Sequence, residues 1–238
     1  MNEKMKDVTC LAEGQVFPAN FDEVGININE LIVGPTGCGK TYSVTIPRIL
    51  HTYNSSLVVP IAKKAVREKC ASLLKERGYK VINLDFTHPE KCEVGYDPMD
   101  YIRSDVDVVQ TARNLIDMAG TKNRSGNPDP YWNDSATSVL AAFIALVRLQ
   151  AEWAKRKPSF ADVLDKYRGM IVKEKNGHFS SSMDEEFIEA EYECPGCQAV
   201  ELWKTISGLS MKTASCILSI LNNALDMFEI QYHFFHVG

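Results

Sequence analysis

The segment from Gly34 to Thr41 constrains the fold of this chain more than any other part of the sequence. It reads GPTGCGKT and fits the pattern G-x4-G-K-[ST] in full. An apolar run, "ELIVG", leads into it, and a helical pattern that begins near Gly39 follows it. In a phosphate-binding loop a buried strand delivers the chain to a turn, where backbone amides and a helix N-terminus face the phosphates. The segment therefore predicts an α/β protein with a P-loop nucleotide site.

Each residue type in the loop has an expected task. Glycine tolerates positive φ and lets backbone amides approach phosphate oxygens closely. Lys40 is expected to reach the β and γ phosphates, and the Thr41 hydroxyl is expected to bind Mg²⁺. The residues expected to bind the cofactor are Gly34, Pro35, Thr36, Gly37, Cys38, Gly39, Lys40 and Thr41.

The nucleotide is expected to be ATP, bound with Mg²⁺. Guanine-specific proteins usually carry the pattern N-K-x-D. The nearest stretch here, "TKNR" at residues 121–124, has the residues in a different order, and no other stretch fits. ATP is therefore favoured over GTP.

The first hundred residues alternate between apolar runs and helical patterns. The runs "NINELIVG", "SSLVVPI" and "YKVINLDF" are typical of strands buried on both faces. Two helical patterns separate them; the first contains Pro47, which should kink or split the helix, and the second ends at Gly78. The order β-α-β-α-β with short connections predicts a parallel sheet covered on both faces.

The pattern changes near residue 104, and helical segments then follow one another for about 100 residues. Ser104 and Ser159 are expected to cap two of these helices. The acidic stretch "GHFSSSMDEEFIEAEYE" is expected to form a loop and a surface helix. The remaining helical segments are "DPYWNDSATSVLAAFIALV", "QAVELWKTISG" and "SMKTASCILSILNNALDMF".

Two further groups of residues are weaker candidates for chemistry. Asp85 ends an apolar strand pattern, as a Walker B acid does, but an ordinary strand-end aspartate is the preferred interpretation. Asp97 and Asp100 are expected to lie in turns. Cys194 and Cys197 have the C-x-x-C spacing of a zinc knuckle, but no second pair of ligands stands at a knuckle spacing. A plain loop between helices is the preferred interpretation of this pair, ahead of a zinc or a redox site.

Composition limits the possible partners and compartments. The net charge of -5 disfavours strong binding of nucleic acid by a lone copy, since phosphate contacts need local positive charge. The basic clusters at residues 62–69 and 154–157 could meet single-stranded DNA inside an oligomer, with solvated helix faces as the simpler interpretation.

Seven scattered cysteines, an odd number, favour a reduced cytoplasmic chain. The apolar run Ser138–Val147 is too short to span a bilayer, so no transmembrane segment is expected.

Several segments, taken together and in order, resemble the TraG/VirD4 family of conjugative coupling proteins, in the branch found in Gram-positive mobile elements. They are "LIVGPTGCGKTYSVTIPRIL", "SSLVVPIAKKA", "LLKERGYKVINLDFTHPEKCEVGYDPMDYI", "DPYWNDSATSVLAAFIALV" and "LWKTISGLSMKTASCILSILNNALDMF". The resemblance extends over residues 28–230, and its most specific parts are "GYDPMDYI" and "DPYWNDSA".

This resemblance implies a RecA/FtsK-like P-loop NTPase domain with an inserted all-α domain. Residues 1–104 would hold a lead-in and the first part of the NTPase domain, residues 105–209 the all-α domain, and residues 210–238 a helix returning toward the NTPase domain. Members of the family are hexameric ATPases on the cytoplasmic side of the membrane. They contact the relaxase on nicked DNA and the proteins of a type IV secretion channel, and they drive single-stranded DNA across.

The sequence also departs from the family pattern. Family members usually carry membrane helices before the P-loop, and their Walker B Asp-Glu lies beyond the all-α domain. This sequence has no apolar span before Gly34 and stops before a Walker B strand, so we expect a truncated coupling protein that binds ATP with negligible hydrolysis. Two alternatives remain: a self-contained small P-loop NTPase or kinase that uses Asp85, and a non-enzymatic adaptor that works through its helical block.

Overall fold

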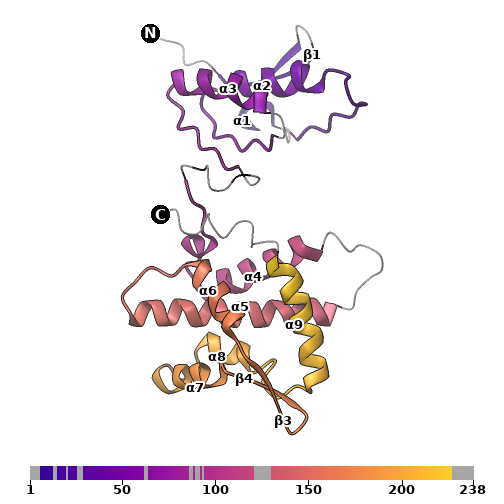
Figure 1. Ribbon diagram of the computed structural model, residues 1–238. Coiled ribbons are helices and arrows are strands. Elements are labelled where there is room, and N and C mark those ends of the chain that lie inside the picture. The colour runs from indigo at the N-terminus through magenta and orange to yellow at the C-terminus, as the bar shows by residue number, and fades with distance from the viewer. Residues whose placement is uncertain are drawn as a thin grey trace. The chain divides into compact units, whose positions relative to one another are not determined.

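The computed structural model divides the chain into two compact units, Met1–Ile82 (unit 1) and Asn83–Gly238 (unit 2) (Figure 1). The structure describes residues 6–12, 15–19, 21–25, 29–61, 64–85, 88, 92, 94–120 and 130–226. The expected polar loop at residues 121–128 and the last residues of the chain lie outside the described residues.

Unit 1 begins with a small antiparallel hairpin that no sequence pattern predicted. The hairpin consists of β1 (Val8–Ala12) and β2 (Gln15–Pro18). The helices of unit 1 are the short helix α1 (Phe21–Val24), the π-helix η1 (Thr41–Thr45), α2 (Ile46–Leu50) and α3 (Lys64–Glu76). The Val8 amide donates to His51 O at 3.2 Å, and the Asn54 amide donates to the Asp7 carboxylate at 2.7 Å. These bonds join the hairpin to the end of α2.

The two predicted helices of unit 1 are confirmed. The first changes from a π-helical to an α-helical turn at Ile46, with Pro47 at the start of the α-helical part, as a proline without an amide hydrogen requires. The second, α3, ends at Glu76, and Gly78 just beyond it has φ +86°, while the Tyr79 amide donates to Leu74 O at 3.0 Å. The small core of the unit comprises Ile46, Ile49, Val66, Cys70 and Leu74.

The three apolar runs that predicted a parallel sheet do not pair as strands in the described part of the chain. Both sheets described are two-stranded and antiparallel. Leu31, Val33 and Val58 are 91%, 84% and 95% exposed. A parallel strand obtains its hydrogen bonds only from strands distant in sequence, so an apolar run alone does not fix it. The RecA/FtsK-like sheet stays a prediction.

Unit 2 is built around one long helix, α5 (Pro130–Trp153). The other elements are the 3-10 helix η3 (Pro98–Tyr101), α4 (Asp105–Gly120), α6 (Phe160–Gly169), β3 (Val172–Lys175), β4 (His178–Ser181), α7 (Asp184–Glu193), α8 (Gln198–Trp203) and α9 (Met211–Leu225). Helices α4, α6, α7, α8 and α9 all contact α5 (Figure 1). Among the described residues α5 is the one helix with the length and apolarity of a membrane span, and 61% of that span is buried inside the unit.

Side-chain caps fix the helix starts that the sequence predicted. Ser104 and Asp107 exchange hydrogen bonds at the start of α4, and Ser159 and Asp162 form a capping box at the start of α6. Ser210 caps α9 by accepting from the Thr213 amide at 3.2 Å. Each cap satisfies amides that would otherwise lack a partner in the first turn.

The Asp97 carboxylate joins two segments that are far apart in the sequence. It accepts from the Met99 amide at 2.8 Å, from Ser159 Oγ at 2.7 Å and from the Phe160 amide at 3.0 Å, so it caps both η3 and α6. Met99 belongs to the core of unit 2. This confirms the turn role expected of Asp97. Asp97 and Met99 thus belong to unit 2, which begins at Asn83.

The expected all-α block contains a β-hairpin, which corrects the sequence interpretation. Strands β3 and β4 pair in the segment "VKEKNGHFSS", and the sequence predicts a loop for the part of it that begins at Gly177. Asn176 and Gly177 form the turn with φ of 55° and 81°. Asn-Gly between two strands is the strongest short-range signal for such a turn, because both residues accept positive φ. Helix α9, expected to return to the NTPase domain, packs in the core of unit 2.

Candidate functional site

The loop from Gly34 to Thr41 forms a tight turn at the start of the helix η1. Gly37 and Gly39 have φ of 85° and 88°, a region that other L-residues rarely adopt. The amides of Tyr42 and Ser43 both donate to Gly39 O at 2.9 Å, so helical bonding starts at the end of the loop. Cys38 is exposed and Lys40 is half-buried. The structure thus brings all eight predicted residues together in one turn, followed by a helix as the motif requires.

The Lys40 ammonium is held inside this loop. It donates to Pro35 O at 2.8 Å and also to Gly34 O. Its contact with Cys38 Sγ, at 3.7 Å, is weaker. The positive charge therefore lies against the loop backbone, close to where the loop amides would bind an anion.

Contacts on both sides of the loop hold its ends in place. Glu30, just before the loop, pairs with Arg48 of α2 at 3.0 Å, and the Glu30 side chain is 17% exposed. Ile46 and Ile49 of α2 pack on α3 in the core of unit 1. Arg77 donates to Leu50 O, the last residue of α2, and lies over the Tyr53 ring at 4.6 Å. The helix that follows the loop is thus fixed by packing and by charge.

Asp85, the weak Walker B candidate, belongs to unit 2 and forms a local turn. Its carboxylate accepts from the His88 amide at 3.2 Å and lies 3.8 Å from His88 Nδ1. The Asp85 amide in turn donates to Cys92 Sγ at 3.1 Å. This geometry is that of a turn-forming aspartate. A role for Asp85 in binding Mg²⁺ stays a prediction.

Cys194 and Cys197 lie in the loop between α7 and α8, as the preferred interpretation expected. The Cys197 amide donates to Cys194 O at 3.1 Å, and Gly196 between them has φ of 73°. Burial, together with the neighbouring Cys197 thiol, raises the pKa of Cys194, which disfavours the thiolate that metals bind. No group of three metal-ligating side chains occurs in the part of the chain that the structure describes.

The basic clusters carry ion pairs where the structure describes them. Lys64 lies 3.6 Å from Glu68, Arg156 pairs with Asp162, and Lys157 lies 2.8 Å from Asp100. Residues 62 and 63 of the first cluster lie outside the described residues. Paired charges of this kind are typical of solvated helix surfaces.

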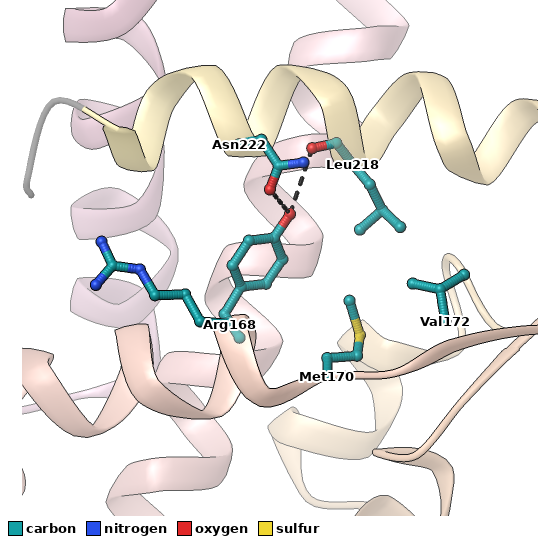
Figure 2. Close-up of a pocket in the computed structure, with 6 residues that line it drawn as sticks. Arg168, Met170, Val172, Leu218 and Asn222 are labelled. Carbon is teal, nitrogen blue, oxygen red and sulfur yellow. Dashed lines mark hydrogen bonds between the residues drawn. The ribbon is translucent and has the colours of Figure 1, made fainter.

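Unit 2 contains a pocket between α6, β3 and α9 that the sequence did not reveal. Its volume is about 320 Å³, and Figure 2 shows Met170 and Val172 on one side, with Leu218 and Asn222 of α9 opposite them. The Tyr167 hydroxyl donates to Asn222 Oδ1 at 2.7 Å. Burial, reinforced by the charge of Asp226, raises the pKa of Tyr167. Tyr167 is therefore a neutral donor that closes the pocket wall.

The sequence matches a family model over residues 4–229, nearly its whole length. That model describes the conjugative DNA transfer proteins of the type IV secretory system. The chain belongs to this family. The resemblance to TraG/VirD4 coupling proteins is thereby confirmed, and this conjugative DNA transfer protein is a component of type IV secretion. Neither the curated proteins nor the solved structures contain a match to it.

Proposed function

We propose that this conjugative DNA transfer protein binds Mg-ATP at the loop Gly34–Thr41 and acts as a coupling protein. The single observation that carries the proposal is the loop itself. Its sequence fits the P-loop pattern in full, Gly37 and Gly39 adopt positive φ, and the Lys40 ammonium lies within the turn. In such a site the loop amides and the lysine hold the β and γ phosphates, while the Thr41 hydroxyl binds Mg²⁺.

The proposed motor has the RecA/FtsK-like arrangement that the sequence predicts, with unit 2 as its helical domain. The exposed apolar runs around Leu31 and Val58 support this proposal, since β-branched and aliphatic side chains of this kind belong inside a sheet. The expected surroundings are a self-associated ring at the cytoplasmic side of the cell membrane. There it would link a relaxase and its single-stranded DNA to the secretion channel.

Mg-ATP titration of the purified full chain by calorimetry tests the nucleotide site. Lys40→Ala should weaken binding by about a hundredfold or more, because the charge-assisted contact proposed between the lysine and the phosphates is lost. Lys64→Ala, which removes an exposed lysine of the same unit, is the matched control and should bind like the parent chain. Equal affinities for the parent and Lys40→Ala would refute the proposal.

Phosphate release measured on the same samples separates the proposal from a self-contained NTPase. A coupling protein whose acidic Walker B group is not Asp85 should show no change in release when Asp85 is replaced by Ala. Turnover lost in both Lys40→Ala and Asp85→Ala would instead identify a small complete NTPase with Asp85 as its Mg²⁺ acid.

A further inference from the structure

Helix α7 (Asp184–Glu193) presents an apolar pair, Ile188 and Tyr192, to solvent. Their exposed fractions are 68% and 83%. Side chains four residues apart lie on the same face of a helix, so the two form one patch. Isolated exposed apolar residues need no explanation, but this pair lies on a helix that is otherwise strongly charged on its outer side.

The opposite face of α7 is fixed firmly in unit 2. Phe187 is 2% exposed and stacks on Trp203 with ring centroids 4.4 Å apart. The Asp184 carboxylate accepts from the Ser181 amide at 2.9 Å and from Trp203 Nε1 at 3.1 Å. Because the inner face has one orientation, the outer face is presented rigidly, and a partner that binds it meets little further loss of conformational freedom.

The charge on α7 has one sign. The sequence DEEFIEAEYE contains six acidic residues and no basic one. Glu185, Glu189 and Glu193 are exposed beside the apolar pair and form no ion pair with the described residues. Glu186, which faces the unit, is instead paired with Lys166. Acid groups without a counter-charge favour a partner that brings lysine or arginine.

We propose that the outer face of α7 is a docking surface for a basic, apolar-bearing segment of another protein. Ile188 and Tyr192 supply the contact area, and Glu185, Glu189 and Glu193 select a positively charged partner. The inference rests on the proposed coupling function, because a coupling protein must bind other proteins, and it names the class of protein that would bind unit 2.

The same charges argue against nucleic acid on this face. A polyanion would meet three uncompensated carboxylates, and nucleic-acid contacts need positive charge. Three residues of the basic clusters, Lys64, Arg156 and Lys157, already carry ion pairs within their own units and are therefore less available to the α7 face of a second copy.

Fluorescence anisotropy on the full chain tests the proposal with a labelled synthetic peptide of leucine and lysine, patterned to form an amphipathic helix. The double variant Ile188→Ser/Tyr192→Ser should bind this peptide about tenfold or more weakly, as expected for loss of an aromatic anchor. The charge reversal Glu189→Lys/Glu193→Lys should weaken binding and flatten its salt dependence. Val106→Ser, at a 77% exposed apolar position on α4, is the matched control and should leave binding unchanged.

Three results would overturn the proposal. The first is an absence of peptide binding, or binding that the α7 variants and Val106→Ser affect equally. The second is a thymidine oligonucleotide that competes with the peptide for this face. The third is self-association of the parent chain that Tyr192→Ser abolishes in size-exclusion chromatography, since a second copy would then cover α7.

Calorimetry with Mg-ATP on Ile188→Ser/Tyr192→Ser keeps this test separate from that of the nucleotide site. The double variant should bind nucleotide like the parent, and an unchanged circular dichroism spectrum of its helices would show that unit 2 is folded. A parent chain that binds the peptide but not Mg-ATP would refute the proposed nucleotide function and leave the docking surface standing.

Discussion

Unit 2 buries its apolar segments, whereas unit 1 leaves several of its own exposed. All residues from Val139 to Val147 on α5 are buried, most of them completely. In unit 1, the side chains from Leu31 to Val33 and from Leu57 to Val59 are all exposed, and the core formed by the described residues contains five buried side chains.

The difference follows from where each structure finds its backbone hydrogen bonds. A helix pairs its amides and carbonyls within one segment, so its apolar face needs only a neighbour to pack against. A strand of a parallel sheet needs two neighbouring strands before its backbone and side chains can be buried. Helical segments can therefore complete a core by packing on one another, whereas the apolar runs of unit 1, which form no strand pairs in the described part of the chain, leave their side chains exposed.

Amide hydrogen exchange should give the largest contrast between the units. Amides in the middle of α5 should exchange at least about a thousandfold more slowly than those of Leu31–Val33 and Leu57–Val59, since protected core helices open only with large-scale unfolding. Mass spectrometry of peptic fragments measures both in one sample. Slow exchange at residues 31–33 would break the comparison and would favour a formed parallel sheet.

Phe143→Ala should produce the largest loss of stability in unit 2. Phe143 is completely buried and makes edge-to-face contacts with Tyr167 at 5.5 Å and Trp203 at 5.7 Å between ring centroids. Removing such a ring costs about 3–5 kcal/mol. Urea unfolding followed by the circular dichroism of the helices measures this cost. Val106→Ala, exposed on α4, should change the unfolding free energy by less than about 0.5 kcal/mol.

Asp97→Ala should destabilise the same unit by about 2–3 kcal/mol, because two helix starts lose their cap at once. The carboxylate serves Met99 and Phe160 amides as well as Ser159 Oγ. Glu174→Ala, on an exposed position of β3, controls for loss of a surface charge. If Asp97→Ala and Ser159→Ala were additive in a double-mutant cycle, the hydrogen bond between the two residues would contribute nothing.

The smallest expected effect is the pH dependence of the stability of unit 2 that arises from Glu186. Burial alone would raise the pKa of Glu186, but the hydrogen bonds from Gln150 and Lys166 and the charge of Lys166 outweigh it and lower the pKa. A lowered folded pKa contributes stability above the ordinary value of 4.5, and this contribution disappears as the pH falls through the folded pKa. Glu186→Gln should flatten the acid side of the stability curve of unit 2, measured by thermal unfolding. An unchanged curve would show that the partly exposed pair contributes nothing.

Local signals predicted local structure well. The pattern at residues 34–41 predicted a glycine turn followed by a helix, and Ser104, Ser159 and Gly78 marked helix ends that the structure confirms. These predictions succeeded because capping, positive φ at glycine and helical periodicity involve residues within one or two turns of each other. Asn176-Gly177 carried an equally local signal for the hairpin β3–β4, which the sequence interpretation missed.

The sequence by itself determined the glycine turn at residues 34–41, the helix ends marked by Ser104, Ser159 and Gly78, and the family of this conjugative DNA transfer protein. Only the tertiary structure decided that Asp97 caps α6 across more than sixty residues, as its bond to Phe160 shows, and that Phe187 stacks on Trp203 so that Ile188 and Tyr192 face solvent. Such contacts join residues far apart in the chain, and their geometry depends on how whole helices pack. Periodicity marks which residues are apolar, but packing decides which of them are covered.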